Sequence, residues 1–286
     1  MEKNTNKNTI NWYPGHMTKA KRGLEKHLKM IDIVVQVLDA RAPKSSMNPD
    51  FVPLFAGKRC VLVLNKEDMA EASATKKWLE YYREKGFRAL SYSAMRPDKK
   101  KLTAAIEAEA AELREKYLAK GMKRTIRCLV CGIPNVGKSA IINTLCGYGK
   151  LKVANKPGVT KQLSWVRIGE YLEIMDSPGL LWPKITDKNV GMNIALMGSI
   201  NELILPEDEL SLHLIRVIGK KNPEMLTERY KMAELPEDPV EVLEGICKAR
   251  GFIMRGGEVD YERAEKVLLE EFRNGKLGRF SLEEAK

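Results

Sequence analysis

The sequence predicts an α/β protein, with a parallel β-sheet covered by helices on both faces and a small all-helical domain behind it. Apolar runs of strand length at 31–40, 59–65, 87–94 and 125–131 alternate with segments of helical spacing, as in sheets that are buried on both faces. From about residue 190 the strand-like runs stop and helical patterns follow one another. We therefore expect a disordered tail over 1–12, a sheet domain over 13–190 and a helical domain over 195–286.

The expected elements follow in order along the chain. After the Pro-Gly turn in "NWYPGHM" (11–17), apolar residues recur at helical spacing among lysines and arginines, which predicts a basic amphipathic helix. Helical patterns then cover 73–85 and 99–120, and residues 162–169 and 171–177 have the pattern of a strand pair joined by a tight turn. In the helical domain, Pro or Asp near the start and Gly, Lys or Arg near the end mark helices at 206–220, 223–235, 238–251 and 260–276.

The composition limits the class of protein. With 44% hydrophobic residues over 286 positions, the chain has enough apolar side chains for one large core or two modest ones. No apolar run reaches 18 residues and the N-terminus "MEKNTNKNTI" is polar, so we expect neither a membrane span nor a secretory signal. Five scattered cysteines, an odd number, suit a reduced cytoplasmic protein without a disulfide framework. We expect a cytoplasmic monomer.

The net charge of +11 is unevenly spread. Residues 191–286 contain 14 Lys and Arg against 19 Asp and Glu, whereas the rest of the chain contains 35 against 19. An excess of positive charge in the first part points to a polyanionic partner, with nucleic acid first. Charge alone leaves open that this part is merely basic and well solvated.

The stretch "GIPNVGKS" (132–139) fits the phosphate-loop pattern G-x-x-x-x-G-K-[ST], directly after the strand-like run 125–131 and before a helical pattern. Its glycines let backbone N–H groups approach phosphate oxygens, Lys138 brings positive charge to the β- and γ-phosphates, and Ser139 offers its hydroxyl to Mg²⁺. We expect Lys138 to act in catalysis as well. The expected nucleotide contacts from this stretch are Asn135, Val136, Gly137, Lys138, Ser139 and Ala140.

"NKED" (65–68) and "YSAM" (92–95) each follow a strand-like run, so both should lie at the carboxyl edge of the sheet, where nucleotides bind. Asp68 can accept hydrogen bonds from the N1–H and amino group of guanine, Asn65 can approach O6 and N7, and the stem of Lys66 can lie along the ring. Ser93 and Ala94 supply a second base contact, through the Ala94 N–H. Adenine would leave Asp68 unpaired, which disfavours an ATPase.

"DSPG" (176–179) ends a strand-like run after the phosphate loop. The carboxylate of Asp176 can hold Mg²⁺ there, and the backbone of Gly179 can sense the γ-phosphate. Between the two motifs, Thr160 lies in the loop "NKPGVTKQ" (155–162), where its hydroxyl can reach Mg²⁺ when a triphosphate is bound. By itself Thr160 is an ordinary loop residue, and its place between the two motifs favours the functional interpretation.

The order of these motifs, NKxD, SA, phosphate loop, Thr and DxxG, resembles that of a circularly permuted GTPase. With "NWYPGHM" in front, "DARAP" (39–43) and "GKLGRFSLE" (275–283) near the end, the chain closely resembles the bacterial ribosome-assembly family of ribosome biogenesis GTPase A, of the YlqF/YawG type. The resemblance implies a circularly permuted Ras-like P-loop GTPase domain over 13–190 and a helical C-terminal domain that binds RNA or the ribosome.

The function that the resemblance implies is hydrolysis of GTP to GDP and phosphate as a switch in late assembly of the large (50S) ribosomal subunit. The implied partners are that subunit and its rRNA, and stimulation of hydrolysis by the subunit is expected. The basic first part of the chain fits RNA, whereas RNA contact by the acidic helical domain would need a local basic face such as Lys248, Arg250 and Arg255. The alternative is a nucleotide-gated RNA- or ribosome-binding module whose own hydrolysis is negligible.

Two further residues bear on hydrolysis. Many Ras-like GTPases carry a water-orienting Gln directly after DxxG, and here that position is Leu180, which cannot orient water. His16 is the candidate for this role, and it remains open that it shapes the turn or contacts RNA instead. Asn135 is a candidate ligand for K⁺ between the phosphates, and the equal alternative is that it only caps or shapes the loop.

Overall fold

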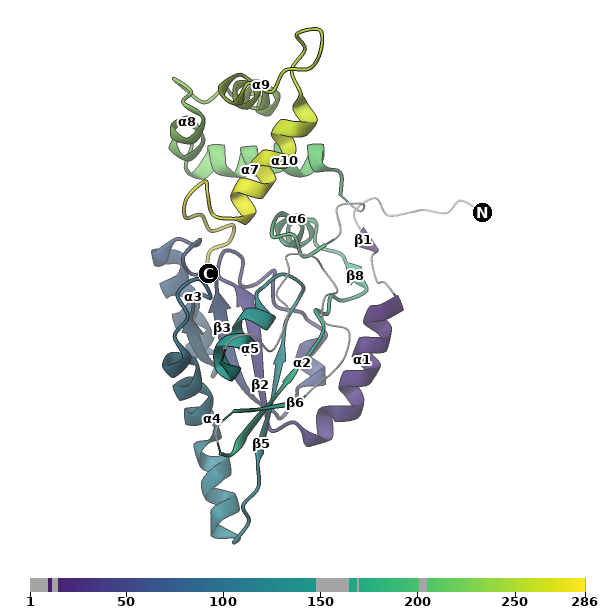
Figure 1. Ribbon diagram of the computed structural model, residues 1–286, viewed down its shortest axis with the longest axis vertical. Coiled ribbons are helices and arrows are strands. Elements are labelled where there is room, and N and C mark those ends of the chain that lie inside the picture. Colours follow the sequence, from purple (N-terminus) through teal and green to yellow (C-terminus); the bar gives the residue numbers. More distant parts are fainter. Residues whose placement is uncertain (1–9, 12–14, 148–164, 169, 201–204, 286) are drawn as a thin grey trace, which may run out of the picture.

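The computed structural model describes residues 10–11, 15–147, 165–168, 170–200 and 205–285. A six-stranded sheet forms the centre of the first part, in the order β4-β3-β2-β5-β7-β6 (Figure 1). All neighbouring strands are parallel except β6, which is antiparallel to β7. The strands are β2 (Ile33–Asp39), β3 (Arg59–Asn65), β4 (Arg88–Ser91), β5 (Ile126–Cys131), β6 (Trp165–Ile168) and β7 (Leu172–Asp176). The predicted parallel strands and the strand pair at their edge are therefore confirmed.

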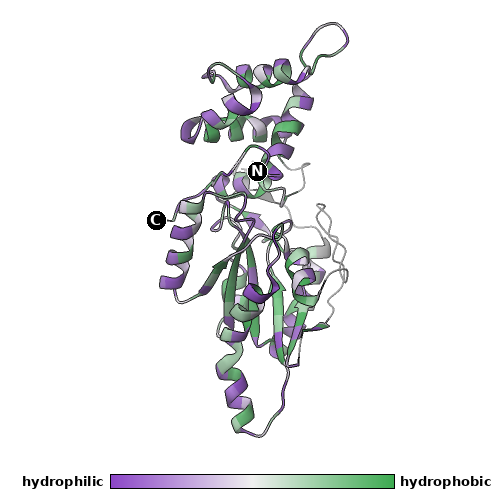
Figure 2. Ribbon diagram, turned by 60° about the vertical axis from the view of Figure 1, so that its left-hand side comes forward, coloured by the Kyte–Doolittle hydropathy of each residue, from purple (hydrophilic) through white to green (hydrophobic). Residues whose placement is uncertain are grey.

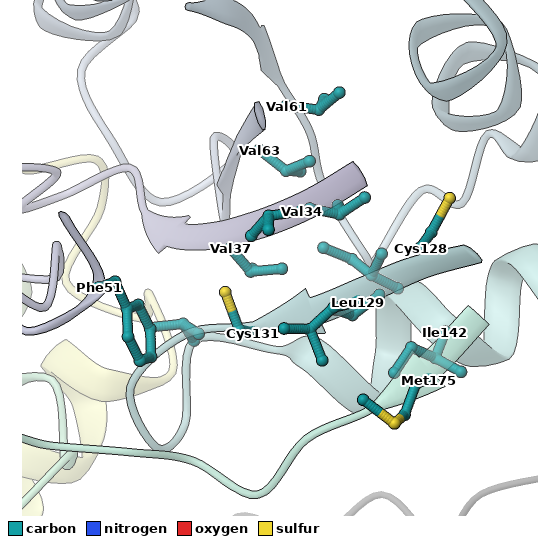
Figure 3. Close-up of a cluster of buried hydrophobic side chains, with 14 of the residues drawn as sticks. Val34, Val37, Phe51, Val61, Val63, Cys128, Leu129, Cys131, Ile142 and Met175 are labelled. Carbon is teal, nitrogen blue, oxygen red and sulfur yellow. The ribbon is translucent and has the colours of Figure 1, made fainter. Parts of the chain in front are cut away.

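Helices cover both faces of the sheet, because successive side chains of a strand point to opposite faces. Val61 and Val63 of β3 belong to the main core with residues of α4 (Lys99–Ala119), whereas Leu62 and Leu64 pack with Trp78 of α3 (Ala72–Glu84). Figure 3 shows part of the main core, with valines of β2 and β3 together with Leu129 of β5 and Met175 of β7. The remaining helices of this part are α1 (Gly15–His27), the 3₁₀ turn η1 (Leu28–Met30), α2 (Phe51–Leu54) and α5 (Lys138–Cys146).

The second part consists of helices with a core of their own, most of them at one end of the molecule (Figure 1), whereas Ile194 of the first of these helices belongs to the main core. Figure 2 shows mixed hydrophilic and hydrophobic colours along these helices, whereas the central strands are mostly hydrophobic. Among the residues that the structure describes, no helix has both the length and the apolar character needed to cross a bilayer. The helices are α6 (Lys188–Leu196), α7 (Glu207–Lys221), α8 (Glu224–Tyr230), α9 (Pro239–Arg250) and α10 (Tyr261–Arg273).

A buried carboxylate joins three of these helices. Glu271 of α10 accepts hydrogen bonds from Arg229 of α8 at 2.7 and 2.9 Å, from the Tyr230 hydroxyl at 2.9 Å and from Arg250 of α9 at 2.8 Å. Burial alone would raise the pKa of Glu271, but its hydrogen bonds and the neighbouring positive charges lower it below the usual value. The carboxylate therefore stays charged and fixes the relative position of the three helices.

The N-terminal segment differs from its prediction. Disorder was expected over 1–12, but Ile10 and Asn11 form strand β1, which pairs antiparallel with β8 (Lys184–Ile185). The prediction is wrong for these two residues because polar composition does not reveal a backbone partner that is distant in sequence. Since β8 follows the "DSPG" stretch, this pair attaches the N-terminal segment to the connection that leads into α6.

The last residues return to the first part. Residues 277–285 contain no helix, and the Phe280 N–H donates to the Met69 carbonyl at 2.9 Å while the Leu282 N–H donates to the Arg41 carbonyl at 2.8 Å. The C-terminus accordingly lies between the two parts near α3 (Figure 1). The region expected to be helical, 195–286, thus ends in a non-helical stretch that contacts the sheet part.

Candidate nucleotide site

The phosphate loop connects β5 to α5 at the carboxyl edge of the sheet, as predicted, and the geometry of its glycines is restrictive. Gly132 has φ 153° and Gly137 has φ 96°, in the left-handed region. A Cβ added at Gly132 would lie 2.5 Å from the Val37 carbonyl oxygen, and one at Gly137 would lie 2.2 Å from Asn65 Nδ2. Only glycine fits at these two positions, so backbone N–H groups can line the site.

Lys138 is the first residue of α5 and is buried. Its Nζ donates to the Ile133 carbonyl at 2.8 Å, so the ammonium lies within the loop itself. Burial lowers the pKa of Lys138 to about 8, although the charge of Asp176 opposes this shift. A phosphate group in the loop would replace the lost solvation of the ammonium, which suits the predicted role of this residue.

Asn65 joins three loops of the site. It is 1% exposed; its Nδ2 donates to the Val136 carbonyl at 2.8 Å, and its Oδ1 accepts from the Ala94 N–H at 3.1 Å. The structure therefore brings together the "NKED", "YSAM" and phosphate-loop stretches that the sequence separates. Direct contact of Asn65 with guanine O6 or N7 stays a prediction.

Two buried polar atoms near Asn65 have no hydrogen-bond partner among the described residues: Asp68 Oδ1 and Ser93 Oγ. A buried polar group without a partner costs free energy, so a ligand or a water molecule that supplies the missing bond is favoured at such an atom. An acceptor at Asp68 fits the amino and N1–H donors of guanine, as the sequence predicted.

Lys66 lies in an ion-pair cluster that the sequence did not predict. It has φ 64°, and its Nζ lies 2.9 Å from Asp39 Oδ2. Arg41 holds the same carboxylate through two bonds of 3.0 and 2.9 Å, from Nε and from a terminal nitrogen. Burial alone would raise the pKa of Asp39, but the charges of Arg41 and Lys66 hold it well below its usual range. The sequence did contain a signal for this cluster. In "DARAP", Asp39 and Arg41 directly follow an apolar strand-like run, which places the charged pair at the sheet edge where nucleotides bind.

The "DSPG" stretch follows β7 and packs on the phosphate loop. A Cβ added at Gly179 would lie 2.8 Å from both N and Cα of Pro134, so this contact also requires glycine. Asp176 is buried at the end of β7, opposite Val130 of the strand that leads into the phosphate loop. Carboxylate and hydroxyl oxygens are ligands that Mg²⁺ prefers, so the donor set of Asp176 and Ser139 fits this ion.

Asn135 connects the phosphate loop to the residues that follow α6. It has φ 61°, and its Nδ2 donates to the Gly198 carbonyl. Beside it, the Ser199 hydroxyl donates to the Pro134 carbonyl at 2.7 Å. These bonds support the interpretation that Asn135 shapes the loop, and they attach the loop to the helical part.

The remaining predicted residues lie in the phosphate loop, in α1 and around "DSPG". Val136 is buried and Ala140 lies in the first turn of α5. His16 is in the first turn of α1, but its side chain lies outside what the structure describes, and Thr160 lies outside the described residues altogether. Leu180 is 2% exposed and its N–H donates to the Gly132 carbonyl at 3.2 Å.

Comparisons with known proteins identify the family of this chain. A family model described as a 50S ribosome-binding GTPase matches residues 127–243. The chain is 42% identical over 276 residues to ribosome biogenesis GTPase A of Bacillus cereus, covering 96% of this chain and 93% of that protein.

Solved structures give the same result. GNP-bound YlqF from T. maritima is similar with a TM-score of 0.69 and 28% identity, covering 93% of this chain and 98% of that one. GDP-bound YlqF is similar with a TM-score of 0.66 and 26% identity, covering 91% and 98%. Together with the phosphate and base loops described above, these similarities over nearly the full length show that the chain belongs to the ribosome biogenesis GTPase A family of GTP hydrolases.

Proposed function

We propose that this protein hydrolyses GTP to GDP and phosphate as a switch in late assembly of the large (50S) ribosomal subunit. The observation that carries the proposal is the meeting of the base and phosphate loops at one sheet edge through Asn65. The unpartnered Asp68 Oδ1 supports guanine as the base. The names of the relative in Bacillus cereus and of the matched family model support the ribosome as the partner.

We infer that the first part is a circularly permuted Ras-like domain. The base-reading strand β3 precedes the phosphate-loop strand β5 in the chain, yet both end at the same edge, and permutation is compatible with a site built from loops. As a consequence, the connection after "DSPG" passes through β8 into α6 and the helical part. A loop that responds to the γ-phosphate is then also the link between the two proposed domains, the GTPase domain over 13–190 and the helical domain over 195–286.

For rRNA we propose the exposed face of α1 and η1 as a contact surface. Lys19, Arg22, Lys26 and Lys29 are all exposed, and their spacing places them on one side of the helix. None of the four takes part in an ion pair with a described residue. On the opposite side, Met17 and Leu24 are buried in the main core. A row of unpaired cations on a rigid helix suits the phosphate backbone of RNA.

The basic face expected on the helical domain is less available. Arg250 is engaged with Glu271 at 2.8 Å, and Lys248 lies 4.0 Å from Glu244. We therefore propose that the main electrostatic contact with rRNA lies on α1. Of the three candidates on the helical domain, Arg255 is the one that forms no ion pair with a described residue.

A matched pair of double variants tests this surface. Arg22→Gln with Lys26→Gln should weaken binding to 50S particles and lower the slope of log affinity against log salt by roughly 0.7–0.9 for each phosphate that the variant no longer neutralises. Lys76→Gln with Lys77→Gln removes the same charge from exposed positions of α3 and serves as the control. Equal effects of the two double variants would contradict the assignment to α1.

For hydrolysis we propose Mg²⁺ bound by Ser139, Thr160 and Asp176, with Lys138 on the phosphates. When bound, Mg²⁺ neutralises charge on the transferred phosphoryl group. The buried Leu180 cannot orient water, so we propose that His16 supplies this function when the subunit is bound. His16→Ala should keep nucleotide affinity and lose the stimulation of GTP turnover by 50S particles, and unchanged stimulated turnover would remove His16 from the mechanism.

We propose K⁺ as a second cofactor near Asn135. The hydrogen bond from its Nδ2 to Gly198 supports the loop-shaping role. The proposal of K⁺ rests on the side-chain oxygen, since amide oxygens are a type of ligand that binds this ion. Turnover measured in KCl and in NaCl separates the two roles, since equal rates would leave only the shaping role.

The alternative function is a nucleotide-gated RNA- or ribosome-binding module with negligible hydrolysis. Leu180 supports this alternative because its side chain cannot orient the attacking water. We propose that the chain acts as a cytoplasmic monomer. Its co-sedimentation with 50S particles, measured with a GTP analogue, with GDP and without nucleotide, tests whether the nucleotide switches binding. GTP turnover with and without the particles then distinguishes the two functions. Binding that is identical in all three nucleotide states would overturn both.

A further inference from the structure

The end of the chain contacts the base-reading loop directly. The Phe280 N–H donates to the carbonyl of Met69, the residue that follows Asp68. The Ser281 hydroxyl accepts from the Glu71 N–H at 3.1 Å, and the Ser281 N–H donates to the Glu71 carboxylate at 3.1 Å. We call residues 280–283 the C-terminal clasp. One short loop is thus held at Met69 and Glu71 by residues more than 200 positions away in the chain.

Arg41 lies where the clasp, the base loop and α10 meet. Its terminal nitrogen donates to the Phe272 carbonyl at 3.0 Å, and its guanidinium lies 5.0 Å from the centre of the Phe272 ring. Its backbone carbonyl accepts from the Leu282 N–H at 2.8 Å. The side chain is 1% exposed, so it reaches the helical part through the interior and not across the surface.

The same guanidinium is linked to the base loop through Asp39. Two bonds from Arg41 hold the Asp39 carboxylate, whose Oδ2 lies 2.9 Å from Lys66 Nζ. Lys66 precedes the guanine-reading Asp68 by two positions and has the left-handed φ of 64° that turns the loop. Arg41 is therefore linked to the surroundings of Asp68 by two routes: its side chain through the ion-pair chain, and its backbone carbonyl through the clasp that also holds Met69.

A second anchor fixes the clasp to the loop after Arg41. Glu283 accepts hydrogen bonds from the backbone N–H groups of Lys44 and Ser45 at 2.9 and 3.1 Å, and from the Ser45 hydroxyl. Asn193 of α6 donates to the same pair of side chains, at 3.1 Å to Ser45 and 3.2 Å to Glu283. The base side of the site is consequently attached to α6 and to α10 as well as to the chain end.

We propose that Arg41 is a positioning residue for guanine recognition and that the clasp couples the helical part to the occupied base loop. The inference rests on the proposed reading of guanine by Asp68. It adds a second line of communication, separate from the γ-phosphate side at Asn135 and Gly198: the helical part senses the base, which GDP and GTP share. By linkage, a base that orders the loop must strengthen the docking of the clasp, and the docked clasp must strengthen base binding by the same factor.

The test compares GDP with inosine diphosphate (IDP), which lacks the 2-amino group whose hydrogen bond Asp68 accepts. In the wild type we expect GDP to bind more tightly than IDP. Arg41→Lys keeps the charge but loses the fork that reaches Asp39 and Phe272 together. It should lower GDP affinity by about tenfold or more, within the range of measured couplings, while changing IDP affinity less, so the GDP-to-IDP ratio falls.

A second variant and a control separate positioning from loss of stability. A chain that ends at Arg279 lacks the clasp but keeps Arg41, and its GDP-to-IDP ratio should also fall. Arg229→Gln removes a hydrogen-bonded ion pair with Glu271 inside the helical part and does not touch the base loop. It should lower the melting temperature and leave the ratio unchanged.

A readout on the unmodified chain completes the test. Amide exchange of residues 280–285 should be slower with GDP than without nucleotide, and IDP should protect these residues less. If Arg41→Lys and the shortened chain both keep the wild-type ratio, the contacts only join the two parts and the inference is overturned while guanine recognition stands. If the wild type itself binds GDP and IDP equally, guanine reading by Asp68 is refuted, and this inference with it.

Discussion

The substitution Asn65→Ala tests how the nucleotide site is held together. Asn65 is 1% exposed, and its amide group makes one bond of 2.8 Å to the Val136 carbonyl and one of 3.1 Å to the Ala94 N–H. Alanine leaves both partner groups without their bond. Each buried group that is deprived of its partner costs about 1–3 kcal/mol, so the two together cost about 2–6 kcal/mol.

The effect should appear mainly in nucleotide affinity. The three loops form the site, and without Asn65 they must be ordered again when the nucleotide binds. Water can solvate the two groups in the empty site, so the lower end of the range applies, and about 2 kcal/mol corresponds to roughly 30-fold in Kd. The measurement is the Kd of fluorescent GDP, with the melting temperature of the nucleotide-free chain recorded beside it.

Asn48→Ala is the matched control. Asn48 is also a buried asparagine; its side chain donates to the Leu180 carbonyl at 2.9 Å and accepts from the Asp50 N–H, and neither of these hydrogen bonds reaches a base loop. It should lower the melting temperature and leave the Kd of GDP within about threefold. If Asn65→Ala also kept the Kd within about threefold, the claim that this side chain organises the site would be refuted.

Three further predictions concern single side chains or a single glycine. Because the pKa of Lys138 is lowered to about 8, GDP binding at about pH 8.5 should be accompanied by uptake of roughly three-quarters of a proton. At about pH 7 the uptake should nearly vanish. Calorimetry in two buffers at each pH measures the number of protons taken up. Glu271→Gln should lower the free energy of unfolding by about 1–3 kcal/mol at neutral pH. Because the pKa of Glu271 in the folded protein is below its usual value of 4.5, the carboxylate stabilises the fold above pH 4.5, and this contribution disappears as the pH falls through the folded pKa. Urea titrations should therefore show a weaker dependence of stability on acid pH in the variant than in the wild type. Gly179→Ala should weaken a GTP analogue more than GDP, because the added Cβ would lie 2.8 Å from Pro134 at the place that we propose senses the γ-phosphate. Equal weakening of both nucleotides would contradict this.

Most secondary structure was predictable because its signals are local. The continuous apolar run 59–65 coincides with β3, and the phosphate-loop glycines place α5 at Lys138. The helix predicted at 223–235 is shorter, since α8 ends at Tyr230, where Lys231 takes the left-handed φ of 55° that terminates a helix. Helix α6 was not predicted, although Asp187 caps it by accepting from the Asn189 and Val190 N–H groups, a signal that the sequence contained.

The sequence by itself determined the chemistry of the site. The residues that we propose read the base and hold the phosphates stand at strand ends, and strand, turn and helix signals lie within a few residues of each of them. The order of the motifs in the chain did not obscure their position, because parallel strands bring their carboxyl ends to one edge.

Only the tertiary structure decided how the two parts hold each other. Arg41 and Phe272 are separated by 231 positions, and Glu71 and Ser281 by 210. No local propensity encodes such contacts, since each depends on the whole path of the chain and on the burial that makes a hydrogen bond or ion pair strong. For this reason the motif "DARAP" was visible in the sequence, while its role between the base loop and α10 became visible only in the folded protein.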